Sequence, residues 1–120
     1  MSEAPIMRRI QLELAKYGLR LFRNNVGMLT DAAGNKVRYG LCNGSSDLIG
    51  LTPVVITPEM VGRRVAIFTA IEVKDKTKLT AEQQNFINFV LSAGGIAFKA
   101  NSEAEAVKLY KTVEAVWKTK

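Results

Sequence analysis

The 120-residue chain contains no histidine, and this absence excludes histidine general bases, Ser-His triads and histidine metal ligands. It contains one cysteine, Cys42, so disulfides within the chain and zinc clusters are excluded as well. We expect Cys42 to be a small buried apolar residue, because a cysteine nucleophile would lack a histidine partner. Any metal bound by this chain would be held by oxygen ligands, which selects hard cations such as Mg²⁺ or Mn²⁺.

The chain also lacks a long apolar segment. No apolar run approaches about 18 residues, and the amino terminus has no signal-peptide pattern, so we expect a soluble protein that is not exported. Its 17 Lys and Arg against 11 Asp and Glu give a net charge of +6 and a pI near 9.7. Such a surplus on a small domain favours contact with a polyanion, most commonly nucleic acid. A membrane surface is less favoured, because no predicted helix combines a basic face with an opposite apolar face.

A length of 120 residues predicts a single domain, residues 1–120, and the sequence shows no internal repeat or linker. Apolar periodicity and capping signals predict its helices and strands. We expect helices over 5–17, 80–94 and from 102 onward, strands over 19–23, 48–51, 67–75 and 96–100, and a hairpin over 27–41. Strands flanked by helices predict an α/β or α+β sandwich with one sheet.

Residues 67–75 are the most informative segment, because an apolar, β-prone run ends in Glu72, Val73 and Lys74. Side chains alternate along a strand, so Glu72 and Lys74 should share one face, roughly 6.5–7 Å apart. Ile71 and Val73 should share the other face, as in a central strand covered on both sides. An ordinary ion pair explains the two charges. A carboxylate that holds a metal-bound reacting group beside an ammonium explains them as well.

A second carboxylate, Asp47, follows the loop 44–46, which contains Gly and Ser, and precedes the apolar run 48–51. An Asp before one apolar strand and a Glu-x-Lys at the end of another form the pattern of a metal-dependent phosphodiesterase. The pattern predicts a site built from Asp47, Glu72 and Lys74.

The first predicted helix contributes a third candidate carboxylate. At 100° per residue, one apolar stripe is formed by Ile6, Ile10, Leu14 and Tyr17. Glu13 projects into the middle of this stripe. A carboxylate on a core-facing stripe must be paired, protonated or bound to metal, so Glu13 is a candidate site residue, and a simple partner such as Arg23 is an equal alternative.

The order of these residues resembles the PD-(D/E)xK nuclease superfamily, and more closely the virus-type replication-repair nuclease (VRR-NUC) domain. The resemblance rests on Glu13, Asp47, Glu72, Lys74 and Gln83, and on the surrounding segments 22–27, 44–50, 68–74 and 79–83. It spans most of the chain and implies a restriction-endonuclease-like fold, with a central mixed β-sheet flanked by helices. The superfamily name suggests a Pro before Asp47, and this chain has none there. The loop is variable in such nucleases.

The resemblance implies a deoxyribonuclease that depends on Mg²⁺ or Mn²⁺. Asp47 and Glu72 would bind the metal, helped by the backbone carbonyl of Val73 and by Glu13. A metal held there polarises a phosphodiester oxygen and lowers the pKa of bound water. Lys74 would orient or deprotonate the attacking water and offset the charge of the phosphorane.

Gln83 has two compatible interpretations. Its amide could hold Lys74, the water or a phosphate, as a catalytic residue, or it could close a capping box with Thr80 at the start of a helix. Arg23, Lys76 and Lys78 are candidates for phosphate contacts, and for each lysine a solvated surface charge is the simpler interpretation.

The resemblance favours a structure-specific DNA endonuclease that resolves Holliday-type branched junctions as a homodimer, without sequence specificity. It further implies the cytoplasm of a bacterial cell that hosts a phage or prophage. Two alternatives stay open: a non-catalytic or sequence-nonspecific nucleic-acid-binding module, and a structural protein in which Glu72 and Lys74 form a salt bridge.

Overall fold

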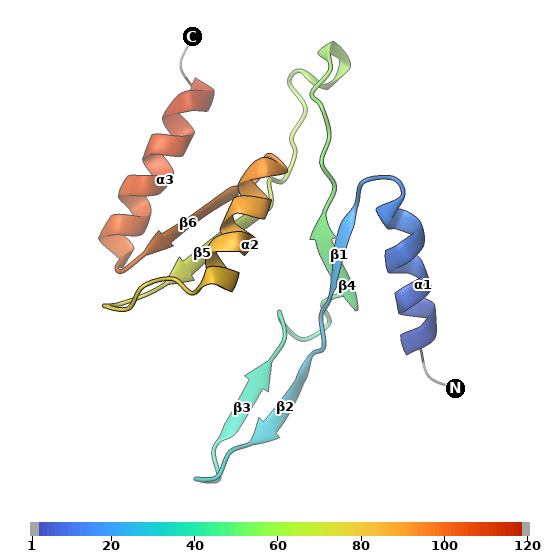
Figure 1. Cartoon of the computed structure of the whole chain (residues 1–120), viewed down its shortest axis with the longest axis vertical. Coiled ribbons are helices and arrows are strands. Elements are labelled where there is room, and N and C mark those ends of the chain that lie inside the picture. The colour runs from blue at the N-terminus through green and yellow to red at the C-terminus, as the bar shows by residue number, and fades with distance from the viewer. Residues whose placement is uncertain (1–2, 119–120) are drawn as a thin grey trace. The chain divides into compact units, whose positions relative to one another are not determined.

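The computed structural model describes residues 3–118 and divides the chain into two compact units, Met1–Val55 and Ile56–Lys120, here unit 1 and unit 2 (Figure 1). The helices and strands confirm the mixed α/β class. The strands of the described residues form three two-stranded sheets, where one central sheet was expected. That the chain folds as a single domain stays a prediction.

Unit 1 contains one helix and two antiparallel strand pairs. Its elements are α1 (Ala4–Ala15), β1 (Arg20–Arg23), β2 (Gly27–Thr30), β3 (Lys36–Tyr39) and β4 (Leu48–Leu51). Strand β1 pairs with β4, and β2 pairs with β3. The β2–β3 hairpin confirms the one predicted over 27–41. Its turn is closed by the Asp31 carboxylate, which accepts from the backbone N–H of Ala33 at 3.0 Å and of Asn35 at 2.8 Å.

The β1–β4 pair depends on a glycine. A Cβ at Gly50 would overlap the carbonyl oxygen of Arg20 and press on the Cα of Leu21. Only glycine therefore permits this approach of the two backbones. The pairing extends from Arg20 opposite Leu51 to Arg23 opposite Leu48, which brings the residue before β4 next to the end of β1.

Helix α1 packs on β1 with a face different from the predicted stripe. Its half-buried side chains are those of Ala4, Met7, Gln11 and Leu14. On this face the Gln11 side-chain amide donates to the carbonyl oxygen of Leu21 at 2.9 Å. A polar group that is hydrogen-bonded in this way can lie on a packed face with little loss of stability. Glu13 lies outside the face: its side chain is 67% exposed and accepts from Lys16 Nζ at 2.9 Å. The predictions that Glu13 faces the core and that Arg23 would be its simple partner are therefore wrong.

Unit 2 contains a two-stranded parallel sheet with helices. Its elements are the short 3₁₀ helix η1 (Pro58–Met60), β5 (Thr69–Val73), α2 (Ala81–Ser92), β6 (Ile96–Ala100) and α3 (Glu103–Lys118). Helix α2 connects the parallel strands and lies over one face of them, and α3 packs against β6 (Figure 1). The apolar core consists of Ile87, Val90 and Ala97, with Phe68, Ala70, Leu79 and Phe89 packed around it.

Helix α2 begins and ends as the sequence predicts. The Thr80 side chain accepts from the backbone N–H of Gln83 at 3.1 Å, and the Gln83 amide oxygen accepts from the N–H of Thr80 at 3.0 Å. This reciprocal pair is the predicted capping box. Gly94 follows the last turn with φ of 94°, a conformation that glycine adopts readily.

Strand β5 is covered on one face only, which corrects the expectation of a strand buried on both sides. Ala70, on the face that packs on α2, is half-buried, as is Glu72 on the same face. Ile71 and Val73 point to the opposite face and are 46% and 74% exposed. The prediction that the Val73 side chain lies in the core is wrong, because α3 packs against β6 rather than beneath β5.

Candidate active site

Asp47 is held next to the end of β1 through its backbone. Its carbonyl oxygen accepts from the N–H of Asn24 at 2.8 Å, directly after the last paired residue of β1. Its side chain is exposed and makes no hydrogen bond or ion pair to the residues that the structure describes. The carboxylate is therefore free to bind a cation or a ligand.

The loop that leads to Asp47 is organised by Asn24, a residue that the sequence alone does not mark as part of the site. The Asn24 amide donates to Ser45 Oγ at 2.7 Å and to the Ser46 carbonyl at 3.0 Å, and it accepts from the N–H of Leu41 at 2.9 Å. Ser45 closes the turn by donating to the Cys42 carbonyl at 2.6 Å. Cys42 itself is exposed on this turn, so the expectation that it is buried is wrong. Only the loop's geometry identifies Asn24, because its partners lie 17 to 22 residues away.

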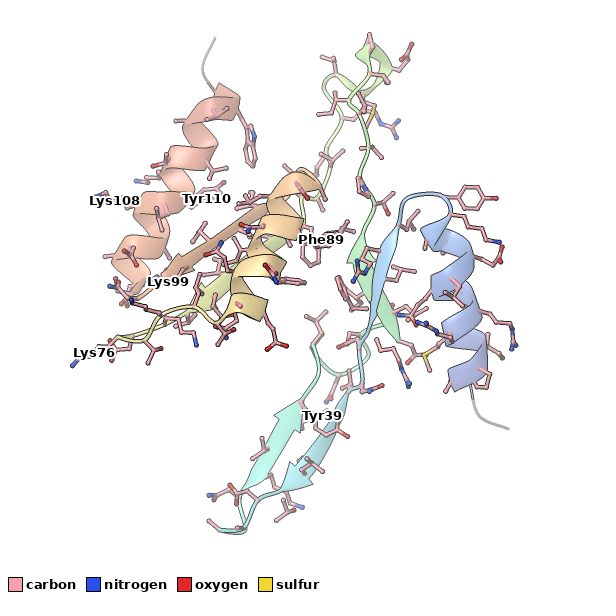
Figure 2. All side chains as sticks on the ribbon, in the orientation of Figure 1. Tyr39, Lys76, Phe89, Lys99, Lys108 and Tyr110 are labelled. Atoms are coloured by element: carbon pink, nitrogen blue, oxygen red, sulfur yellow. The ribbon has the colours of Figure 1, made fainter. Side chains whose placement is uncertain are left out.

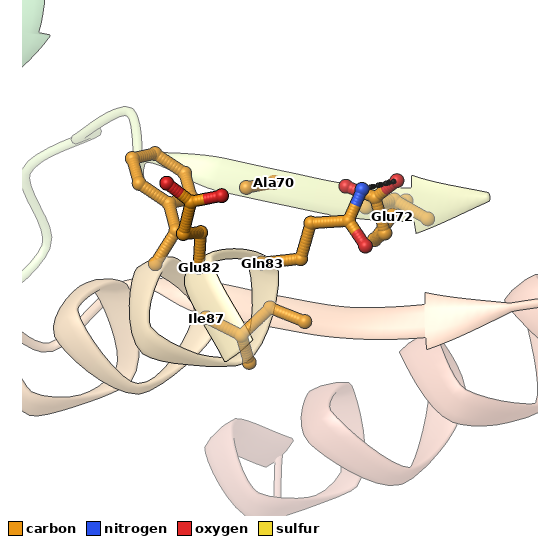
Figure 3. A pocket seen from close by; sticks show the side chains of 7 residues that line it. Ala70, Glu72, Glu82, Gln83 and Ile87 are labelled. Atoms are coloured by element: carbon orange, nitrogen blue, oxygen red, sulfur yellow. Dashed lines mark hydrogen bonds between the residues drawn. The ribbon is translucent and has the colours of Figure 1, made fainter. Parts of the chain in front are cut away.

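Glu72 lies on β5 and is connected to α2 by one hydrogen bond. Gln83 Nε2 donates to Glu72 Oε2 at 3.2 Å (Figure 3). The same amide closes the capping box through its oxygen, so the structural interpretation of Gln83 is confirmed and a contact with the site residue Glu72 is added. One oxygen of Glu72 has no hydrogen bond within residues 3–118, which suits a carboxylate that binds a cation with its free oxygen.

Lys74 follows β5 and continues its alternation, so Glu72 and Lys74 project from the same face, and both are half-buried. The Lys74 N–H donates to the Ala100 carbonyl at 3.1 Å, which keeps the residue in register with β6. Within the described part of the chain the two charges form no ion pair. The observed geometry therefore gives no support to the salt-bridge alternative.

The pairing of β5 with β6 leaves the Val73 carbonyl outside the ladder. The Phe68 carbonyl accepts from the N–H of Ile96, and the Lys74 N–H donates to the Ala100 carbonyl. Residues 68 and 74 therefore direct these backbone groups toward β6. Successive residues of a strand direct their backbone groups to opposite edges, so the Val73 carbonyl points away from β6. In the described chain no strand pairs with that edge of β5. A carboxylate oxygen and a backbone carbonyl at one strand end fit the donor set of Mg²⁺ or Mn²⁺.

A pocket of about 410 Å³ lies between β5 and α2, beside Glu72. Its lining consists of Ala70, Ile71, Glu72, Glu82, Gln83, Phe86 and Ile87. Figure 3 shows the side chains of Glu82 and Gln83 both directed from α2 toward the strand. Glu82 was not identified from the sequence, because one carboxylate in the first turn of a helix is common for local electrostatic reasons.

Several cations of unit 2 lie near the carboxyl end of β5. Lys76 and Lys78 are exposed in the loop between β5 and α2, and Figure 2 shows Lys76 pointing outward from it. Lys99 of β6 is opposite Glu72 in the register and projects from the same face. Lys99 cannot be identified from the sequence, because the register that pairs it with Glu72 is a long-range feature. In unit 1, Arg23 is exposed and donates to Asn25 Oδ1 at 3.3 Å.

Comparison with known protein families identifies the family of this chain. The family described as the VRR-NUC domain matches residues 2–104. The chain belongs to the VRR-NUC family. Neither a curated protein nor a solved structure matches it.

As a VRR-NUC domain, the chain is a nuclease of the PD-(D/E)xK type, with DNA as its substrate. Nucleases of this type generally use divalent metals. Among the described residues, no three Asp, Glu or Cys side chains gather into a metal-binding cluster. Asp47 belongs to unit 1 and Glu72 to unit 2, so a metal shared by both stays a prediction. No helix in the described chain is long and apolar enough to cross a membrane.

Proposed function

We propose that this VRR-NUC domain is a structure-specific DNA endonuclease that needs Mg²⁺ or Mn²⁺ and resolves branched junctions as a homodimer. The observation that carries the proposal is the family match over residues 2–104, which includes every predicted site residue. The net charge of +6 supports binding to the phosphate backbone, which is independent of sequence. Two copies related by a twofold axis would supply one site for each of two strands.

The proposed metal ligands are Asp47, Glu72 and the Val73 carbonyl, with Glu13 as a further candidate. A metal held by these groups would supply Lewis-acid polarisation of the phosphodiester and an activated water. Gln83 holds one oxygen of Glu72, which orients the carboxylate and leaves its other oxygen available for the metal. Lys74, on the same face as Glu72, orients the attacking water and stabilises the negative charge of the transition state.

The proposed phosphate contacts are Arg23, Lys76 and Lys78. All three side chains are exposed, as contacts to a large polyanion must be. We add Lys99, because its position opposite Glu72 brings a second ammonium to the carboxylate. Each such contact should position the DNA without selecting its sequence.

The test is a cleavage assay on four-way, flapped and linear DNA with Mg²⁺, Mn²⁺ or EDTA. Glu72→Gln and Lys74→Ala should each slow cutting by at least about a hundredfold, because each removes a group that acts on the reacting phosphate. Both side chains lie outside the apolar core, so circular dichroism and thermal unfolding should be unchanged. EDTA should stop cutting, and added Mn²⁺ should restore it.

Matched controls are Glu59→Gln on η1 and Lys108→Ala on α3, which remove the same charges from exposed positions outside the site. Gln83→Glu is a sharper variant: it preserves the capping box, in which either residue serves, but places a second carboxylate against Glu72. It should lose activity, and it should lose some stability because the two carboxylates repel each other. Cutting that persists in both Glu72→Gln and Lys74→Ala would overturn the assignment. DNA binding without cutting, unaffected by EDTA, would favour the non-catalytic binding module.

A further inference from the structure

The pocket at Glu72 has several lining residues that the cleavage chemistry does not use. Its walls are the apolar side chains of Ala70 and Ile87 and the ring of Phe86, which is 39% exposed. Its volume of about 410 Å³ is within the range of small-molecule sites, roughly 300–1,000 Å³. An aromatic ring beside apolar walls suits a flat, unsaturated group.

The polar groups of the pocket limit what that group can be. Gln83 is engaged at both ends of its amide, with Thr80 through the oxygen and with Glu72 through the nitrogen. The Glu82 side chain makes no hydrogen bond within the described residues and is thus the acceptor that remains for a ligand. Two carboxylates in one pocket repel a phosphate but attract a neutral group that carries N–H donors.

We propose that this pocket binds one unstacked nucleobase of the DNA, next to the scissile phosphate. Phe86 stacks on the base, and Glu82 accepts from an exocyclic amino group, as a carboxylate does with the N4 amine of cytosine. The pocket should therefore favour cytosine or adenine over thymine, which has no amino group. This inference rests on the proposed function and adds a base preference to a site expected to act mainly on DNA shape.

The position of the pocket on β5 fits this ligand. Ala70 and Glu72 both line the pocket, two residues apart on the same face of the strand and roughly 6.5–7 Å from each other. A phosphate bound through a metal at Glu72 would therefore lie beside the pocket, with its base directed toward Phe86.

The first test measures binding without cleavage. The full chain, without added metal, is titrated with deoxycytidine and with thymidine, which lack the repelled phosphate, while the Phe86 ring signals are followed by NMR. Deoxycytidine should shift these signals and bind at least about fivefold more tightly than thymidine. Glu82→Gln should remove the difference, and Phe86→Leu should weaken binding of both nucleosides about tenfold. Glu59→Gln and Tyr110→Leu are the controls for charge and aromaticity, and both should behave as the parent chain.

The second test uses branched DNA that differs only in the base beside the mapped cut. Thymine or an abasic nucleotide there should slow cutting by at least about fivefold, and Glu82→Gln should cut the thymine and cytosine substrates equally. Equal binding of deoxycytidine and thymidine at Phe86, or a base preference that survives Glu82→Gln, overturns the pocket assignment. If the chain cuts DNA but neither nucleoside shifts Phe86, only this inference fails. If deoxycytidine binds selectively but nothing is cut, the proposed function fails and the pocket stands.

Discussion

The two units of the chain are stabilised in different ways. Unit 2 has an apolar core around Val90, which is completely buried, and its parallel strands are held by the helix that connects them. In the described residues of unit 1, only Leu51 is buried. Unit 1 relies on antiparallel pairing, on the close approach at Gly50 and on the polar network around Asn24.

This difference separates the two halves of the predicted site. Glu72 and Gln83 are placed by a strand and a helix that share an apolar core, so their positions depend on burial. Asp47 is placed by the hydrogen bonds of a loop. Each of these bonds contributes less than the burial of a core side chain and is more easily replaced by bonds to water. We therefore expect the geometry around Glu72 to tolerate surface changes, and that around Asp47 to depend on single polar residues.

The largest expected effect comes from making the same substitution, Ile to Ala, in each of the two units. Ile87→Ala on α2 removes a core side chain and should lower the free energy of unfolding by about 2–5 kcal/mol. Ile10→Ala on α1 changes a side chain that is 40% exposed and should cost less than about 1 kcal/mol. Chemical denaturation measures both. If Ile10→Ala costs as much as Ile87→Ala, then Ile10 is buried in solution and the contrast between the units is incorrect.

The same contrast explains how much of the fold the sequence predicts. The capping box at Thr80, the hairpin turn at Asp31 and the bounds of β4 and β6 follow from local signals, and the structure confirms them. The face of α1 does not, because its apolar residues allow two stripes and the observed face includes the polar Gln11, which bonds to β1. The local sequence pattern of a helix does not reveal contacts with residues outside that helix.

The site shows the same division. Glu72 and Lys74 can be placed on one face from alternation alone. Lys99 and Asn24 cannot, because their relevance depends on a register and on a loop closure that join distant segments. The apolar run of β5 predicts burial on both faces, but coverage depends on the elements that pack there, and α3 packs against β6 instead.

The next prediction concerns Asn24 as a positioning residue for Asp47. Asn24→Ala removes three hydrogen bonds of a half-buried amide and should lower the free energy of unfolding by about 1–3 kcal/mol. If Asp47 binds the metal, the variant should also need more Mn²⁺ for half-maximal cutting, with the KM for DNA unchanged. Hydrogen exchange at the Leu41 amide, which Asn24 accepts from, should accelerate.

Asn24→Asp provides the control for this role. The variant keeps the acceptor for Leu41 but cannot donate to Ser45 or Ser46. Hydrogen exchange at the Leu41 amide should therefore stay near the parent rate, while the loop before Asp47 becomes less ordered. An unchanged Mn²⁺ requirement in Asn24→Ala, measured at a temperature where the chain is fully folded, would show that Asn24 supports the fold alone.

The smallest expected effect belongs to Glu13, the least supported of the proposed ligands. Its carboxylate is 67% exposed and bound to Lys16 three residues away, and such surface pairs contribute about 0.2–0.5 kcal/mol. Glu13→Gln should therefore leave stability within about 0.5 kcal/mol of the parent. Lys16→Met is the matched variant, because it breaks the same pair but keeps the carboxylate. If Glu13→Gln raises the Mn²⁺ requirement and Lys16→Met does not, the carboxylate binds metal. If both variants cut as the parent does, Glu13 acts only as an exposed partner of Lys16, and the metal is left to Asp47, Glu72 and the Val73 carbonyl.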